Sequence, residues 1–338
     1  MTADVPPSFG ISASAVHDPL IMKRDDKQMF SKKRKRAVIA VLTAGMLLVS
    51  SVLSLSARFG WEFPTWESVF AFAGLSEHGE SAVEPGMTAE FLDVGQGSSA
   101  LIYGRDFSIL IDTGEREYGE RLLSRLKALR IEKLDFLIIT HPHTDHMGAA
   151  AQLLGRIAVG EVLMPEIREA LIPTAASYET FLLAVKENGA KASYARTGDI
   201  FTAGDASVRV IAPSAAGNDL NDLSLTLRVS YGETAVVVTG DAPEKAELQM
   251  VESGADMRAE ILVCGHHGSK FSTAIPFLKA VSPSYAVISC GKNNSYGHPN
   301  AETLRRLEAQ NVAIYRTDLL GTVVFQSDGK KFVPVTKL

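Results

Sequence analysis

The sequence predicts an α/β domain of two β-rich halves covered by helices, preceded by a single transmembrane helix. Residues 37–57 form an uncharged stretch directly after a basic cluster. From residue 87 onward, short apolar runs of strand length come first, helices follow, and this order occurs twice. Two such segments bury their apolar faces against each other and against helices. Six of the eight histidines lie beside turns that follow apolar runs.

Composition excludes several classes of protein. Of the 338 residues, 46% are hydrophobic and 22% charged, as in folded proteins and unlike disordered or collagen-like chains. Two cysteines, Cys264 and Cys290, cannot form a disulfide scaffold or a thiolate zinc site. We expect both to be small buried apolar residues, with a disulfide between them as the alternative.

Charge is distributed unevenly along the chain. The formal net charge is −5, but residues 1–58 hold nine of the 34 Lys and Arg and four of the 39 Asp and Glu. The rest of the chain keeps 25 basic and 35 acidic residues, a charge of −10. Such an acidic domain disfavours tight non-specific binding to a nucleic-acid backbone unless it carries a local basic groove.

The stretch 37–57 predicts a transmembrane helix, because about 20 apolar residues span the hydrocarbon core of a bilayer. Basic residues cluster just before it, and the positive-inside rule then places the N-terminus in the cytoplasm. The expected parts are a disordered basic tail, the membrane helix, a juxtamembrane linker and one extracytoplasmic domain, at residues 1–36, 37–57, 58–86 and 87–338.

Two alternatives to this single-pass anchor in the cell membrane stay open. One is a buried core helix, which the flanking basic cluster disfavours. The other is a signal peptide, with a small-x-small cleavage site at residues 54–56 that would release a secreted domain. The apolar run is longer than the ~7–15 residues of an ordinary signal peptide, which favours the anchor.

The elements of the domain follow from apolar periodicity and turn residues. In the first half we expect strands at residues 91–93, 99–103 and 108–111, a helix at 118–130, a strand at 134–140 and a helix ending near Gly155. In the second half we expect strands at 208–212, 223–229 and 235–239, then helix and strand alternately at 243–253, 261–264, 274–280, 286–290 and 301–310.

Four candidate metal ligands follow the strand 134–140 within six residues. Imidazole and carboxylate bind zinc and similar divalent ions. A strand that stops at a loop of alternating ligands can aim His141 and His143 at one ion. Asp145 and His146, at the start of the next helix, would then face a second ion. The alternative is a helix N-cap at Asp145 beside polar loop histidines.

Further candidates follow other apolar runs. Asp241 begins a segment that also resembles a helix capping box, and one carboxylate can serve both roles. His266 and His267 are adjacent, so we expect one to bind metal and the other to contact substrate or support the site. We assign His266 to the metal and His267 to catalysis, and the reverse assignment stays open. His298 follows a strand and a polar loop, and is a catalytic candidate together with Asp145; a plain loop histidine is the alternative.

These residues resemble the metallo-β-lactamase superfamily in the same chain order. The matching segments are Ile111-Asp112-Thr113-Gly114, His141-Pro142-His143-Thr144-Asp145-His146, Gly240-Asp241 and His266-His267-Gly268-Ser269. Three more are similar to the extracytoplasmic hydrolase domain of the ComEC competence proteins: Asp93-Val94-Gly95-Gln96-Gly97, Asn221-Asp222-Leu223-Ser224-Leu225 and Asn294-Ser295-Tyr296-Gly297-His298-Pro299. The resemblance covers about residues 87–338.

The resemblance implies an αββα sandwich with two divalent metal ions at the strand ends, zinc being favoured and manganese the alternative. The implied ligands are His141 and His143 for the first ion, Asp145, His146 and one of His266 and His267 for the second, and Asp241 between them. Asp112 would support the ligand loop from behind. Most superfamily members supply another histidine, but residues 147–265 contain none, and Asn221 stands at the matching place as a weak ligand.

The resemblance also implies an extracytoplasmic hydrolase of phosphodiesters, and the similarity to ComEC favours DNA as its substrate. Uptake of DNA would need a separate channel protein as partner. Two other functions stay open: hydrolysis of a cell-envelope phosphodiester or phosphocholine ester, and binding without catalysis by an anchored domain.

Overall fold

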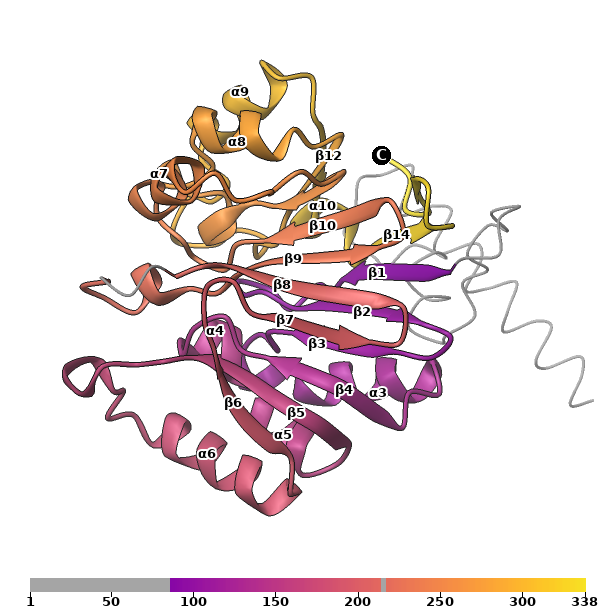
Figure 1. Cartoon of the computed structure of the whole chain (residues 1–338), viewed down its shortest axis with the longest axis vertical. Helices are drawn as coiled ribbons and strands as arrows, with labels where there is room; N and C mark the ends of the chain where they lie inside the picture. Colours follow the sequence, from indigo (N-terminus) through magenta and orange to yellow (C-terminus); the bar gives the residue numbers. More distant parts are fainter. Residues whose placement is uncertain (1–85, 214–216) are drawn as a thin grey trace, which may run out of the picture. The chain divides into compact units, whose positions relative to one another are not determined.

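The computed structural model describes residues 86–213 and 217–338, which form two β-sheets with helices on both outer sides (Figure 1). The predicted tail, membrane helix and linker lie outside these residues. Among the helices described, none is long and apolar enough to cross a membrane.

The first sheet has eight strands in the order β15-β14-β1-β2-β3-β4-β5-β6. Its strands are β1 (Met87–Phe91), β2 (Ala100–Gly104), β3 (Ser108–Ile111), β4 (Lys133–Ile138), β5 (Ala158–Pro165), β6 (Lys191–Ala195), β14 (Val323–Ser327) and β15 (Phe332–Pro334). Strands β3 to β6 run parallel to one another, whereas the strands on the other side of β3 pair antiparallel.

The second sheet has seven strands in the order β13-β12-β11-β10-β9-β8-β7. Its strands are β7 (Ile200–Ala203), β8 (Ala206–Ala212), β9 (Thr226–Tyr231), β10 (Thr234–Val238), β11 (Ile261–Val263), β12 (Tyr285–Ile288) and β13 (Ala313–Arg316). Strands β10 to β13 are parallel, so the segments that follow β10, β11 and β12 leave the sheet at one edge.

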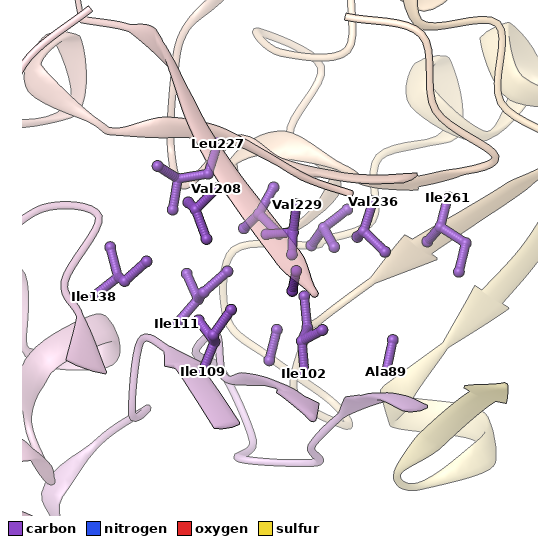
Figure 2. Packing of buried hydrophobic residues seen from close by; sticks show 14 of the residues in the cluster. Ala89, Ile102, Ile109, Ile111, Ile138, Val208, Leu227, Val229, Val236 and Ile261 are labelled. Carbon is purple, nitrogen blue, oxygen red and sulfur yellow. The ribbon is translucent and has the colours of Figure 1, made fainter. Parts of the chain in front are cut away.

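The main hydrophobic core lies between the two sheets (Figure 2). Strand β10 shows how the sequence builds it. Val236 and Val238 face this core, whereas Ala235 and Val237 face the helices on the outer side. Successive side chains of a strand point to opposite faces, so a strand covered on both faces must be apolar throughout.

Helices cover the outer face of each sheet, which confirms the αββα sandwich. The main helices are α3 (Gly119–Ala128), α5 (Ala150–Leu154) and α6 (Ala176–Asn188) over the first sheet, and α7 (Glu244–Glu252), α8 (Ile275–Val281) and α9 (Ala301–Glu308) over the second. In α3, Leu122 and Leu126 lie four residues apart and both are buried against the sheet, as helical periodicity predicts.

Three expected elements differ from the observed ones. The strand expected at residues 91–93 lies earlier, as β1 (Met87–Phe91), and shares only Phe91 with it. The strand expected at residues 223–229 begins only at Thr226, because Asn221–Leu223 forms a 3₁₀ turn. The helix expected to end near Gly155 is divided into α4 (Thr144–Met147) and α5. The cysteines are as expected: Cys264 and Cys290 are buried with free thiols, and burial raises the pKa of each to about 12.

Candidate metal centre

Side chains from both sheets converge where the parallel strands end, and they form two groups of metal-ligand type. His141, His143 and Asp241 make one group; Asp145, His146, Asp241 and His267 make the other. Within each group, one ligand atom per residue lies within 4.8 Å of all the others. Asp241 belongs to both groups, so it would be the ligand shared by two neighbouring ions.

The first sheet contributes its ligands through the segment after β4. His141 lies in a bend after β4 and His143 on extended backbone just before α4, and their rings meet edge-on with centroids 4.6 Å apart. His141 Nε2 lies 2.9 Å from His143 Nδ1 and 3.7 Å from Asp241 Oδ2. The chain then turns into α4, which carries Asp145 and His146 toward the second sheet.

Asp112, which follows β3, lies behind this loop and is fully buried. The backbone N–H of Thr140 donates to Asp112 Oδ1 at 2.7 Å, and the Thr140 hydroxyl donates to Oδ2 at 2.8 Å. His146 Nδ1 lies 2.7 Å from the same Oδ2 and, facing an acceptor, must be the donor. Thr140 was not predicted as a site residue, although a polar residue at the end of an apolar strand is a detectable signal.

The atoms opposite Asp112 indicate that the site suits a cation. With Nδ1 held by Asp112, His146 Nε2 faces Asp241 Oδ1, 3.1 Å away, and presents a lone pair whenever it carries no proton. Both atoms are buried, and apart from each other neither has a polar partner at hydrogen-bonding distance among the described residues. Two buried acceptors face each other stably only with a proton or a metal ion between them, so the donor set fits a metal.

His267 is held in the same way from the second sheet. Its Nδ1 lies 2.9 Å from the carbonyl oxygen of Ser289, which can only accept, so Nδ1 is the donor. Its Nε2 then faces two carboxylates, 3.2 Å from Asp145 Oδ2 and 3.7 Å from Asp241 Oδ1. This fixes the ring orientation that metal-bound histidines commonly show.

Of the two adjacent histidines, His267 and not His266 lies where a metal ligand is expected. The side chain of His267 is 4% exposed and lies among the ligand atoms, whereas that of His266 is 33% exposed. His266 Nε2 is 3.8 Å from Asp241 Oδ2 and belongs to neither group. Both residues have left-handed backbone, with φ of 51° and 55°, which turns the two rings apart.

Charges within the site shift several pKa values. Burial tends to raise the pKa of Asp145, but the hydrogen bond from His267 and the charges of His146 and His267 lower it to about 2. Burial lowers the pKa of His141 well below its usual range. Burial would lower that of His146 too, but the carboxylates of Asp241 and Asp112 hold it well above that range. A metal at this position therefore competes with a proton on His146.

The glycine-rich segment after β1 contacts both the backbone of Asp145 and a loop of the second sheet. The N–H of Ser98 donates to the Asp145 carbonyl at 3.1 Å, and a Cβ at Gly97 would lie only 2.5 Å from that oxygen. Gln96 Oε1 accepts a hydrogen bond from the N–H of Gly291, which follows β12. This segment therefore links the loops that hold Asp145 and His267.

The remaining predicted residues lie around the centre. The expected helix cap at Asp241 is wrong: α7 begins after Pro243 without a side-chain cap, because the Asp241 carboxylate points into the site.

The His298 ring centroid is 5.7 Å from that of His266, and burial together with His266 and His267 lowers the pKa of His298. Asn221 lies in the turn before β9, and its Oδ1 is buried without a hydrogen-bond partner.

Glu247 of α7 anchors the chain that follows His267. Its buried carboxylate accepts the N–H groups of Thr273 and Ala274 at 2.7 and 2.8 Å. Burial raises the pKa of Glu247 to about 7 despite these hydrogen bonds. Between pH ~4.5 and ~7 the folded chain therefore holds a proton that the unfolded chain has released.

Because the pKa of Glu247 is raised in the folded chain, we expect the free energy of unfolding to fall as the pH rises through about 7. The free energy of unfolding should decrease by about 3 kcal/mol between pH 5 and 8, and Glu247→Gln should remove most of this change. The measurement is urea unfolding at both pH values, with exposed Glu244→Gln as matched control. A Glu247→Gln chain that keeps the wild-type pH dependence would exclude Glu247 as its source.

Comparison with known proteins agrees with this geometry. The family model of the metallo-beta-lactamase superfamily matches residues 92–292. ComE operon protein 3 of Bacillus subtilis (strain 168) is 31% identical over 280 residues, which are 76% of this chain and 34% of that protein. Competence protein ComA of Neisseria gonorrhoeae is 30% identical over 328 residues, 96% of this chain and 40% of that protein. The chain thus spans about a third of the length of these relatives.

Solved structures support the fold. YhfI from Bacillus subtilis, a metallo-beta-lactamase fold protein, matches 71% of this chain and 100% of its own at a TM-score of 0.51 and 14% identity. CmlA, a diiron beta-hydroxylase from Streptomyces venezuelae, matches 81% of this chain and 59% of its own at a TM-score of 0.50 and 16% identity. The chain belongs to the metallo-β-lactamase superfamily, is related to the competence proteins, and carries side chains that could hold metal ions.

Proposed function

We propose that the chain is a membrane-anchored, extracytoplasmic phosphodiesterase of nuclease type that works with two divalent metal ions. One observation supports the dinuclear centre: Asp241 is shared by both groups of candidate ligands, with Oδ2 3.7 Å from His141 Nε2 and Oδ1 3.1 Å from His146 Nε2. Relationship to competence proteins supports DNA as the phosphodiester. The anchor at residues 37–57 is supported by its uncharged sequence after a basic cluster.

Each of the two groups of candidate ligands would hold one of the two ions. His141, His143 and Asp241 would hold the first ion, with Asn221 Oδ1 as a weak further ligand. Asp145, His146, Asp241 and His267 would hold the second. When bound, the ions would supply a hydroxide nucleophile and positive charge for the phosphoryl oxygens. We favour zinc for this set of imidazoles and carboxylates, with manganese as the alternative.

The protein residues around the ions have separate tasks. Asp112 and the Ser289 carbonyl hold His146 and His267 with Nε2 directed inward. We assign contact with the substrate to His266 and His298, whose rings lie beside the ligand groups, so that His266 takes the role first assigned to His267. Because the pKa of His298 is lowered, its ring is neutral at pH 7 and can donate one hydrogen bond to a phosphoryl or leaving-group oxygen.

In DNA uptake such a hydrolase would act beside a separate channel protein. If a signal peptide is cleaved instead, the same domain would be secreted, and fractionation of cells that produce a C-terminally tagged chain separates the two cases. Recovery in the membrane fraction after alkaline extraction supports the anchor, whereas recovery in the medium contradicts it.

The test of activity uses the purified full-length chain. We expect close to two metal ions per chain by elemental mass spectrometry, and hydrolysis of both bis(p-nitrophenyl) phosphate and single-stranded DNA. Asp145→Ala should abolish both hydrolyses. Hydrolysis of the small ester alone would favour a cell-envelope phosphodiester or phosphocholine ester. No metal and no hydrolysis after addition of Zn²⁺ or Mn²⁺ would indicate a binding domain instead.

A further inference from the structure

Three aromatic rings form a continuous run from the candidate metal centre to the surface. The innermost, His266, lies beside Asp241, and His298 packs edge-on against it with ring centroids 5.7 Å apart. Tyr296 stacks on His298, with centroids 5.8 Å apart and an angle of 24° between the planes. Tyr296 is 68% exposed, so most of its ring faces solvent.

The outer ring is presented on a fixed backbone. The Asn294 side chain donates to the carbonyl oxygens of Gly291 and His298 and accepts the N–H of His298. On the other side, the Asn300 amide donates to the carbonyl of Gly297 at 2.9 Å. A large ring that is held rigidly, yet gains little from burial, is typical of a binding contact rather than of a packing contact.

A cation and a second exposed ring lie next to this loop. The Asn300 side chain that holds Gly297 also accepts the N–H of Lys270 at 2.8 Å. The Lys270 ammonium lies 5.1 Å from the centroid of the Phe271 ring, which is 65% exposed. Lys270, Phe271 and Tyr296, here called the stacking patch, thus combine planar faces with positive charge on an otherwise acidic domain.

We propose that the stacking patch binds single-stranded nucleic acid, with a nucleobase stacked on Tyr296 and the sugar–phosphate backbone passing Lys270 toward the metal centre. Exposed aromatic rings beside cations are the means by which proteins bind single strands without reading sequence, since every base has a flat π-face. A duplex keeps its bases stacked on one another, so the patch selects single strands. The inference rests on the proposed nuclease function and names its substrate class.

Binding tests the patch without requiring activity. Fluorescence anisotropy would follow a fluorescein-labelled oligothymidylate and the same oligomer with abasic sites, using the full-length chain treated with EDTA so that no cleavage occurs. We expect Tyr296→Ala to weaken binding of the oligothymidylate about tenfold and Tyr296→Trp to retain it. The matched control is Tyr194→Ala, since Tyr194 is 52% exposed on β6 of the other sheet, and it should change binding less than twofold.

The outcomes separate the patch from the enzyme. Equal binding by wild type and Tyr296→Ala, equal binding of the thymidine and abasic oligomers, or no binding of DNA by the wild type would each overturn the inference. Hydrolysis of bis(p-nitrophenyl) phosphate by the metal-loaded wild type tests the nuclease proposal independently. If the wild type hydrolyses this ester but DNA binding does not depend on Tyr296, the stacking patch is refuted and the nuclease proposal is not. If DNA binding depends on Tyr296 but the ester is not hydrolysed, the stacking patch is supported and the proposed enzyme is refuted.

Discussion

Asp241→Asn should remove most of the bound metal and reduce hydrolysis of bis(p-nitrophenyl) phosphate at least about a thousandfold. Asp241 is the residue that both ligand groups share. An amide keeps the size of the side chain but loses the negative charge, so it cannot place one anionic oxygen toward each ion. Metal content per chain and the rate of ester hydrolysis measure the two effects on the same sample.

Asp256→Asn is the matched control for this substitution. Asp256 is also an aspartate of the second half, but it lies exposed in an ion pair with Arg258, and its change should leave metal content and rate within twofold of wild type. Circular dichroism should show that Asp241→Asn remains folded. Retention of two ions with a rate within tenfold of wild type would refute the bridging role of Asp241.

Asp112→Asn should lower metal affinity about 10- to 100-fold, although Asp112 belongs to neither ligand group. The amide can still accept the N–H of Thr140, but it no longer offers an anionic acceptor to His146 Nδ1. His146 then loses the contact that orients it and raises the basicity of Nε2. Competition with a chelator of known affinity measures this change.

A second variant separates orientation from folding. Asp112→Ala leaves Thr140 and His146 without their buried partner and places alanine at a φ of 58°, so it should also lower the free energy of unfolding by about 3 kcal/mol. Asp112→Asn avoids most of this cost, because Asn tolerates left-handed backbone. Exposed Asp106→Ala serves as control. Unchanged metal affinity in Asp112→Asn would show that Asp112 has only a structural role.

Local periodicity determined the secondary structure where the pattern was strong. Leu122 and Leu126 predicted α3, and the apolar run at residues 235–239 predicted the strand β10, which the structure shows to be covered on both faces. The pattern is obscured in α6, which buries Tyr178, Phe181 and Val185 but also carries apolar Leu182 and Leu183 on its exposed side. The pattern also fails for β6. This strand lies at the edge of the sheet, and most of its side chains are exposed, so buried and exposed residues do not alternate along it. Neither element was predicted.

The sequence by itself determined which loops form the candidate centre, because the candidate metal ligands cluster in short loops after buried strands. Only the tertiary structure decided their geometry. Asp241 and His146 are 95 positions apart in the numbering, and the packing of two sheets brings their ligand atoms within 3.1 Å. The choice between His266 and His267 depends on the Ser289 carbonyl, which the next parallel strand places beside one ring. No spacing in the sequence encodes a contact between strand ends, since it arises when the sheets pack.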